Sequence, residues 1–291
     1  MPKASTRKTF RVRDYDLSAT LASGQVFRWR QNEGTWAGVV GARWVRLWQN
    51  RDTITAETAE PVTDWSWLAD YLQLGLNLRS VLASFPKDEP MRAAVTACRG
   101  LRLLRQDPWE CLASFVLSST KQIVQIQQII ALLCERHGKR IAVPPGQPPA
   151  FVFPSPQRLA RATETELRKC KMGFRAPHLL ATGRAVASGR FDLRHLRDLP
   201  AETARTELMK LSGVGPKIAD CVLLFAYGFP SAFPIDVWVA KALRKLYFPH
   251  RRVSIKHMRE FAATHFGRNA GYAQQYLFHY MRTRSGRTIR E

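Results

Sequence analysis

Hydrophobic and polar residues alternate along four short segments near the start of the chain. The segments are residues 25–31, 35–40, 43–49 and 52–58. Alternation with a period of two is typical of strands that bury one face. Short turns at residues 32–34, 41–42 and 50–51 separate consecutive segments. The pattern therefore predicts an antiparallel meander.

The hydrophobic period changes at residue 64, where apolar residues begin to recur at helical spacing. The predicted helical segments are residues 64–74, 91–104, 109–119, 123–137, 156–170, 202–212 and 217–228. The proline-rich residues 143–156 predict a long loop between two of them. We therefore expect an α+β fold, with an N-terminal antiparallel β domain with flanking helices over residues 1–88 and a mainly helical domain over residues 89–291.

The charge of the chain indicates a polyanionic partner. Lys and Arg number 45 against 23 Asp and Glu, which gives a formal net charge of +22. Nucleic acid, an anionic membrane surface and acidic proteins all fit this charge. No apolar run approaches the roughly 18 residues of a spanning helix, and the basic N-terminal segment lacks the apolar core of a secretory signal. We expect a protein that is neither membrane-embedded nor secreted.

The cysteines argue against a disulfide framework and against a zinc site. They form an odd, widely spaced set with no C-x-x-C pair. They are Cys98, Cys111, Cys134, Cys170 and Cys221. The sequence therefore predicts no metal cofactor.

Residues 202–228 predict two helices joined by a glycine turn. Gly213 and Gly215 flank Val214 in this turn, and Pro216 suits the first position of the second helix. Glycines allow close approach of the backbone, and open N–H groups at a helix start can receive a phosphate oxygen. An ordinary helical turn is the alternative interpretation, but the net charge favours a phosphate-binding helix-hairpin-helix.

Two residues near this hairpin have the chemistry of a catalytic pair. Lys217 lies at the start of the second helix, where the helix dipole opposes an ammonium. Asp236 precedes an apolar-periodic segment and has the position of an N-cap. Considered separately, Lys217 would be interpreted as a solvated surface lysine and Asp236 as an aspartate that only caps a helix. Together they predict an amine nucleophile beside a carboxylate in one cleft.

At these residues the chain resembles the helix-hairpin-helix (HhH-GPD) glycosylase superfamily, and within it the 8-oxoguanine DNA glycosylases. The resemblance rests on ordered motifs that span most of the chain. These are residues 21–30, 102–115, 153–160, 167–176, 213–220, 234–237 and 271–278. The resemblance implies a bifunctional DNA glycosylase and AP lyase of base excision repair that needs no cofactor and acts on double-stranded DNA containing 8-oxoguanine.

The resemblance also implies roles for individual residues. Lys217 attacks the deoxyribose C1′ and forms a Schiff base, which permits strand cleavage by β-elimination, while Asp236 stabilises the developing positive charge. In the base pocket, Gly24 accepts the N7 hydrogen of the oxidised guanine and Gln274 reads the Watson–Crick edge. The flipped base is sandwiched between Phe278 and Cys221, as extrusion of the base from the stack requires.

The DNA-binding residues depart from the family pattern as it stands in the eukaryotic members. Thr120 replaces an asparagine that fills the vacated space in the duplex, and Phe174 replaces a wedge tyrosine. Trp238 replaces a phosphate-binding histidine. Of two arginines that read the opposite cytosine, one matches Arg175 and the other is Gln125. We expect selectivity for the opposite base to be the least conserved property.

Two alternative functions fit parts of the sequence. An alkylated-base glycosylase of the same superfamily generally lacks the hairpin lysine, so Lys217 disfavours it. A non-catalytic DNA-binding module would use the hairpin only as a clamp, and the joint presence of Lys217, Asp236 and Gly24 disfavours it. We expect a monomer that acts on the nucleoid in a bacterium or in the nucleus of a eukaryote.

Overall fold

The N-terminal domain is built on a five-stranded antiparallel sheet. The computed structural model describes residues 5–119 and 122–284. The strands follow the order β1-β5-β4-β3-β2 across the sheet. Their bounds are β1 (Ser5–Arg11), β2 (Arg30–Asn32), β3 (Thr35–Val40), β4 (Arg43–Asn50) and β5 (Thr53–Val62). The predicted meander is confirmed as β2 to β5, and β1 is an additional edge strand.

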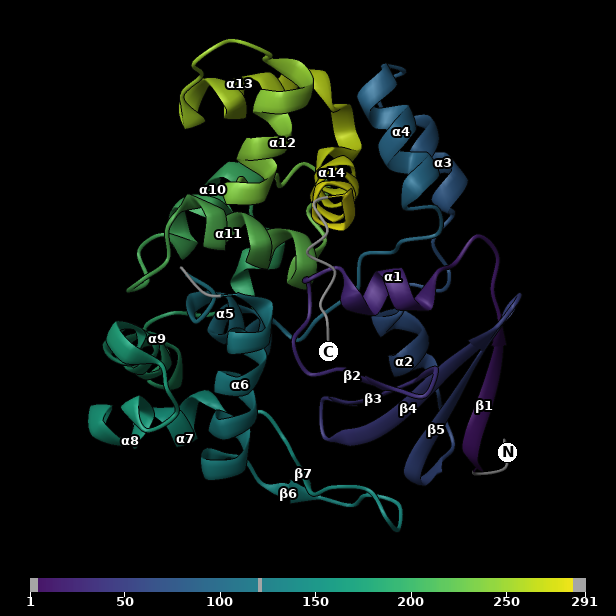
Figure 1. Cartoon of the computed structure of the whole chain (residues 1–291). Coiled ribbons are helices and arrows are strands. Elements are labelled where there is room, and N and C mark those ends of the chain that lie inside the picture. The colour runs from purple at the N-terminus through teal and green to yellow at the C-terminus, as the bar shows by residue number, and fades with distance from the viewer. Residues whose placement is uncertain (1–4, 120–121, 285–291) are drawn as a thin grey trace.

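The hydrophobic pattern did not predict β1 because nearly all of its residues are exposed and no buried face alternates along it. Strand β2 is shorter than predicted, since residues 26, 27 and 29 are buried in an irregular segment before it. The inner face of the sheet carries Val45, Leu47 and Ile54, which are fully buried. Helices α1 (Leu17–Ala22) and α2 (Ser66–Tyr71) contribute to the same apolar cluster and lie beside the sheet (Figure 1).

The rest of the chain is mainly helical. The helices are α3 (Leu78–Ala83), α4 (Glu89–Ala97), α5 (Pro108–Val116), α6 (Ile123–His137), α7 (Pro156–Ala160), α8 (Glu164–Arg168), α9 (Ala176–Ala187), α10 (Ala201–Leu208), α11 (Pro216–Val222), α12 (Val237–Tyr247), α13 (Ile255–His265) and α14 (Ala270–Arg284). A sheet domain followed by a helical domain confirms the predicted α+β fold class.

Three predicted segments differ in detail from the structure. The helix predicted over residues 91–104 ends at Ala97, because Gly100 has a φ of +87° and the Leu104 N–H donates to the Gln25 side chain instead of a helical carbonyl. Residues 156–170 form α7 and α8 rather than one helix, because Thr163 and Glu166 form a capping box that starts a new helix. The predicted proline-rich loop contains a short strand, β7 (Ala150–Phe151), which pairs with β6 (Arg140–Ile141) just before the loop.

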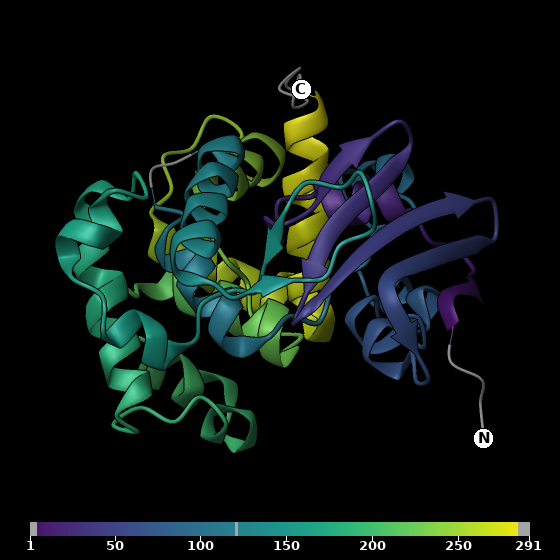
Figure 2. The ribbon, with the colours of Figure 1, turned by 90° about the horizontal axis from the view of Figure 1, so that it is seen from below.

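Helix α14 connects the two parts of the molecule. It lies between the sheet domain and the other helices, as Figure 2 shows from below. The Gln275 Nε2 donates to the Ser23 carbonyl at 3.0 Å, and the Tyr276 hydroxyl donates to the Leu101 carbonyl at 3.0 Å. The first of these buried bonds fixes the segment that begins at Ser23 against α14, and the second fixes the segment at Leu101 against the same helix.

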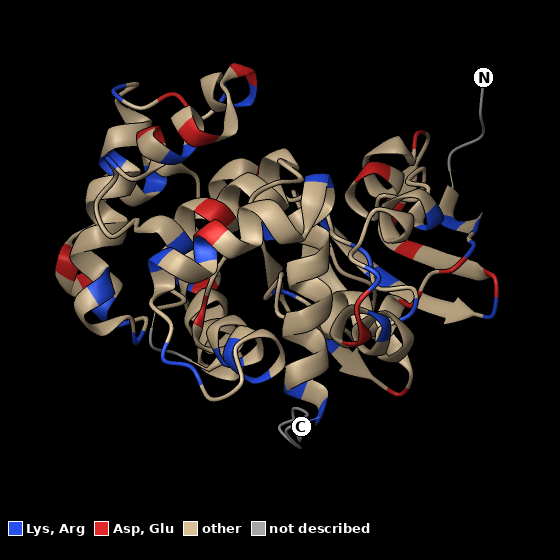
Figure 3. Ribbon diagram, turned by 90° about the horizontal axis from the view of Figure 1, so that it is seen from above, with Lys and Arg blue, Asp and Glu red and all other residues tan. Residues whose placement is uncertain are grey.

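Lys and Arg are distributed over both parts of the molecule and outnumber Asp and Glu (Figure 3). Within residues 5–119 and 122–284, no helix is long and apolar enough to span a membrane. The same residues contain no group of three or more His, Cys, Asp and Glu that could hold a metal ion.

Candidate active site

The hairpin consists of α10, a glycine turn and α11. Gly213 has a φ of +77°, and a Cβ there would stand 2.8 Å from the Cβ of His178, so a side chain would be both strained and crowded. Val214 is buried, so only its backbone can face a ligand. Gly215 occupies the N-cap of α11 and Pro216 its first turn, as predicted. The turn therefore presents backbone groups rather than side chains.

A buried ion pair joins the two helices of the hairpin. The Asp220 carboxyl, 1% exposed, accepts from the Arg205 Nε at 2.6 Å. Burial raises the pKa of Asp220 to about 6, while the guanidinium of Arg205 opposes that rise. Breaking such a pair by removing one partner costs about 3–5 kcal/mol. The pair thus fixes α11, and with it Lys217, against α10.

Lys217 points toward the end of α5. Its Nζ donates to the Ser118 hydroxyl at 2.9 Å and lies 5.3 Å from the centre of the Phe115 ring. These two contacts hold the amine of the half-buried Lys217 against the C-terminal end of α5. The predictions did not include Ser118, because a serine at a helix end has no periodic signal that relates it to a residue 99 positions later.

Asp236 is the N-cap of α12, as predicted. Its Oδ1 accepts from the Val239 N–H at 2.8 Å. Burial raises the pKa of Asp236 above the ordinary value, while the bond from Val239 and the charge of Lys217 oppose the rise. Asp236 and Lys217 therefore lie within electrostatic range of each other, and the carboxyl sits in a partly desolvated site.

Two of the four predicted base-pocket residues, Gly24 and Phe278, come close together from distant segments of the chain. Gly24 has a φ of +80°, and a Cβ there would be 3.3 Å from the Phe278 ring and 2.7 Å from Ile123. Gln274 is 3% exposed, and its Oε1 has no hydrogen-bond partner among the described residues. Burial raises the pKa of the Cys221 thiol to about 12, and Lys217 is the nearest opposing charge.

Gln25 holds the glycine segment in place. Its Nε2 donates to the Thr20 and Arg102 carbonyls at 3.0 and 2.8 Å, and its Oε1 accepts from the Leu104 N–H at 2.8 Å. A fully buried amide with its bonds satisfied specifies one conformation. Gln25 was not predicted as a site residue, since its partners are carbonyl groups and N–H groups that carry no sequence signal.

The predicted DNA-binding side chains lie outside this pocket. Phe174 is 58% exposed, which suits a residue that inserts between bases. Arg175 is 2% exposed and lies 4.2 Å from the Phe174 ring. The Gln125 Oε1 accepts from the Gln122 N–H at 3.1 Å in a capping box at the start of α6. Lys241 covers the Trp238 ring at 5.5 Å. Thr120 lies outside the described residues.

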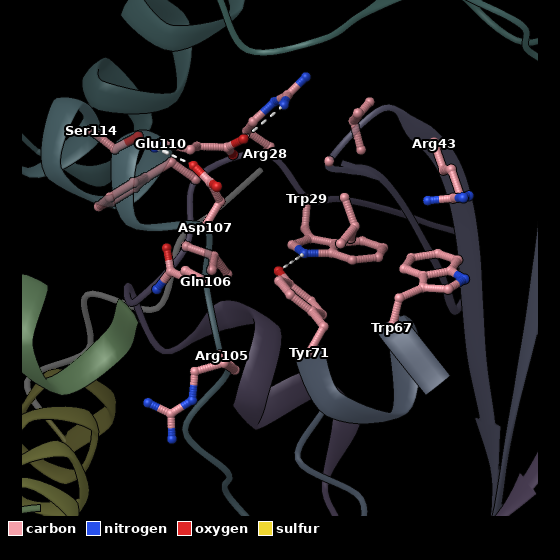
Figure 4. Close-up of a pocket in the computed structure, with 15 residues that line it drawn as sticks. Arg28, Trp29, Arg43, Trp67, Tyr71, Arg105, Gln106, Asp107, Glu110 and Ser114 are labelled. Atoms are coloured by element: carbon pink, nitrogen blue, oxygen red, sulfur yellow. Dashed lines mark hydrogen bonds and ion pairs between the residues drawn. The ribbon is translucent and has the colours of Figure 1, made fainter. Parts of the chain in front are cut away.

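A separate cavity of about 240 Å³ lies between the sheet domain and α5 (Figure 4). Arg28 pairs with Glu110 across it at 3.2 Å, and the Trp29 indole donates to the Tyr71 hydroxyl at 2.8 Å. None of the predicted site residues lines this cavity. Its polar contacts attach the segment after Gly24 to α5, the helix that also carries Phe115.

A helix-hairpin-helix turn, a lysine at the start of its second helix and a capping aspartate at the start of the helix that follows are typical of the class of HhH-GPD base-excision glycosylases. The family model for HhH-GPD superfamily base excision DNA repair proteins matches residues 113–265. The model for the 8-oxoguanine DNA glycosylase N-terminal domain matches residues 9–112.

Relatives and solved structures agree with these matches. A probable N-glycosylase/DNA lyase from Methanothermobacter thermautotrophicus is 30% identical over 94% of this chain and 96% of its own. The structure of MBOgg1 with a low-affinity DNA ligand has a TM-score of 0.91 at 34% identity, covering 97% of this chain and 98% of that one. A Clostridium acetobutylicum 8-oxoguanine glycosylase/lyase, solved with DNA containing cytosine opposite 8-oxoguanine, has a TM-score of 0.91 at 30% identity, covering 98% of each. The chain belongs to the 8-oxoguanine DNA glycosylase family of N-glycosylase/DNA lyases.

Proposed function

We propose that this protein is a bifunctional DNA glycosylase that flips 8-oxoguanine out of duplex DNA, excises it and nicks the strand by β-elimination. The observation that carries the proposal is the electrostatic interaction between the Lys217 amine at the start of α11 and the Asp236 carboxyl at the start of α12. The buried Gln274 oxygen, which has no partner among the described residues, also supports it. The 8-oxoguanine and lyase activities named for the similar proteins support it.

The reaction uses groups of this chain at each step. After losing a proton, the Lys217 Nζ attacks C1′, and the bond from C1′ to N9 breaks with its electrons passing to the base, which is protonated as it leaves. The ionised Asp236 stabilises the positive charge that develops on the sugar. Opening of the sugar ring gives an imine between Nζ and C1′. Loss of a C2′ proton then expels the 3′ phosphate.

The hairpin serves as the backbone clamp on a phosphate. The backbone N–H groups of Gly213 and Gly215 suit an anion, whereas the Val214 N–H donates to the Leu211 carbonyl at 3.1 Å and holds the turn in place. We place Phe174, Arg175, Gln125, Trp238 and Thr120 against the distorted duplex and the opposite strand. The protein acts as a monomer in this proposal, at the nucleoid of a bacterium or in the nucleus of a eukaryote, with the glycosylase domain over residues 89–291.

Borohydride trapping on a duplex with a single 8-oxoguanine tests the proposal. Reduction of the imine would leave a covalent complex of protein and DNA, and we expect it to form with the 8-oxoguanine duplex and not with a matched guanine duplex. Trapping on an alkylated-base duplex alone would favour an alkylated-base glycosylase. Binding without trapping or nicking on any lesion would favour a non-catalytic DNA-binding module.

A further inference from the structure

One face of α14 carries three side chains at a spacing of four residues. They are Gln274, Phe278 and Arg282. Residues separated by four lie above one another on a helix. Gln274 and Phe278 are the predicted base-pocket residues on this face, whereas no role has been assigned to Arg282 so far.

The guanidinium of Arg282 is buried without a hydrogen-bond partner for its Nη1. The residue is 9% exposed, and no described residue accepts from this nitrogen. An unsatisfied buried donor is costly, more so when it is charged. Burial lowers the pKa of Arg282, and the charge of Asp236 opposes this shift. Such a group has no acceptor among the described residues, and a ligand that enters the site can supply one.

The Nη1 atom of Arg282 lies beside Gly24 and Phe278, two residues of the predicted base pocket. Nη1 lies 3.2 Å from the point where a Cβ on Gly24 would stand, and the Phe278 Cε1 lies 3.3 Å from the same point. The guanidinium carbon is 5.3 Å from the centre of the Phe278 ring. Gly24, the Phe278 ring and the Arg282 guanidinium therefore meet at one place. Along the axis of α14, Gln274 lies about 6 Å before Phe278 and about 12 Å before Arg282.

This arrangement matches the two ends of an oxidised purine. The Watson–Crick edge and C8 lie at opposite ends of the bicyclic ring, so a base stacked on Phe278 with one end at Gln274 has the other end toward Gly24 and Arg282. At that end 8-oxoguanine carries an N7–H donor beside a C8 carbonyl acceptor. Guanine has a C–H group at C8, which cannot satisfy a guanidinium donor.

We propose that Arg282 donates a hydrogen bond to the C8 carbonyl oxygen of the flipped 8-oxoguanine and is a specificity-determining residue for the oxidised base. The proposal rests on the proposed function. Arg282 and the Gly24 carbonyl then recognise the oxidised edge at two points, one by donating and the other by accepting.

The substitution Arg282→Met tests this proposal, with Arg284→Met as the matched control. Arg284 is two residues further along α14 and is exposed, and its guanidinium lies 5.1 Å from the centre of the Tyr280 ring. Arg284→Met therefore removes one positive charge and one cation–aromatic contact, as Arg282→Met does. We expect Arg282→Met to slow single-turnover excision of 8-oxoguanine about 10- to 100-fold, as for loss of a hydrogen bond from a charged donor. The control should excise the base at the wild-type rate.

Two further measurements separate a base contact from a phosphate contact. Binding to a duplex with a tetrahydrofuran abasic-site analogue, and nicking of a preformed abasic site, should be the same in Arg282→Met as in the wild type, since neither DNA contains the base. Retained nicking also shows that the variant is folded. An equal loss of affinity for the abasic analogue would overturn the proposal in favour of a phosphate contact.

Unchanged excision by Arg282→Met would also overturn the proposal, and so would an equal loss in Arg284→Met. These outcomes would contradict only the role proposed for Arg282 and would leave the proposed glycosylase function intact. Failure of the wild-type protein to excise 8-oxoguanine would instead contradict the proposed function.

Discussion

The base pocket and the surface that faces the opposite strand differ in how their side chains are engaged. The proposed base pocket comprises Gly24, Cys221, Gln274, Phe278 and Arg282, and two of its buried polar atoms, on Gln274 and Arg282, have no partner in the described chain. The proposed DNA-facing surface comprises Gln125 and Arg175 at the opposite base, the wedge residue Phe174 and Trp238 at a phosphate. Its polar and charged side chains make contacts within the protein.

This difference bears on the cost of recognition. The base pocket is held by the bonds of Gln25 and Gln275, so little has to be reorganised when a base enters. The Gln125 amide, in contrast, caps α6, and Arg175 must move its buried guanidinium outward to reach a base. We therefore infer that lesion recognition is preorganised and that opposite-base recognition is the weaker of the two.

The largest expected effect concerns the nucleophile. Lys217→Gln should reduce borohydride trapping and nicking to background, because no amine remains to form the imine. Binding to lesion DNA should be largely intact, since the base pocket does not depend on the lysine. Trapping and electrophoretic mobility shifts measure the two properties. A mutant that is trapped at the wild-type rate would mean that another amine is the nucleophile.

Asp236→Asn should slow base release about 10²- to 10³-fold, the size of effect found when one preorganised electrostatic group is removed. Asparagine is also a good N-cap, so α12 should keep its start and the melting temperature should change little. Single-turnover excision and thermal unfolding are the measurements. If the mutant were grossly unfolded, only the capping role of Asp236 would be supported.

The same carboxyl predicts an acidic limit to excision. Burial raises the pKa of Asp236 above its ordinary value of 3.8, and the carboxylate must be ionised to stabilise the sugar cation. The excision rate should therefore fall as the pH drops below this raised pKa, by about tenfold per pH unit. The folded state binds this proton more tightly than the unfolded chain, so Asp236 does not promote acid unfolding. A pH–rate profile with Asp236→Asn as the control should show the limb only in the wild type.

The comparison of the two regions also shows what the sequence can predict. The hairpin and the pair Lys217 and Asp236 were predicted because helix starts, caps and glycine turns have local signatures. The resemblance supplied Gly24 and Gln274. Arg282 was not predicted, because an arginine near a helix end is ordinarily solvated and only the packing of α14 buries it. Strand β1 was missed because its residues show no buried face.

The smallest expected effect concerns the base opposite the lesion. Two arginines can donate to the N3 and O2 atoms of an unpaired cytosine and reject bases that present donors. Here Arg175 retains one such group, whereas Gln125 brings no charge, and its amide can donate or accept. Each good bidentate base contact is worth roughly 1–3 kcal/mol of discrimination, so losing one relaxes selectivity by about tenfold or more.

We therefore expect excision opposite cytosine to be only modestly preferred over excision opposite thymine, guanine and adenine, and Gln125→Arg to strengthen that preference about tenfold. Gln125 also caps α6 through the Gln122 N–H, so Gln125→Glu, which keeps an acceptor for this bond without providing a donor, is the matched control for helix stability. Single-turnover rates on four duplexes that differ only in the opposite base measure the effect. A strong wild-type preference for cytosine that Gln125→Arg leaves unchanged would show that Arg175 or another group is sufficient to read the opposite base, and the two regions would then be equally selective.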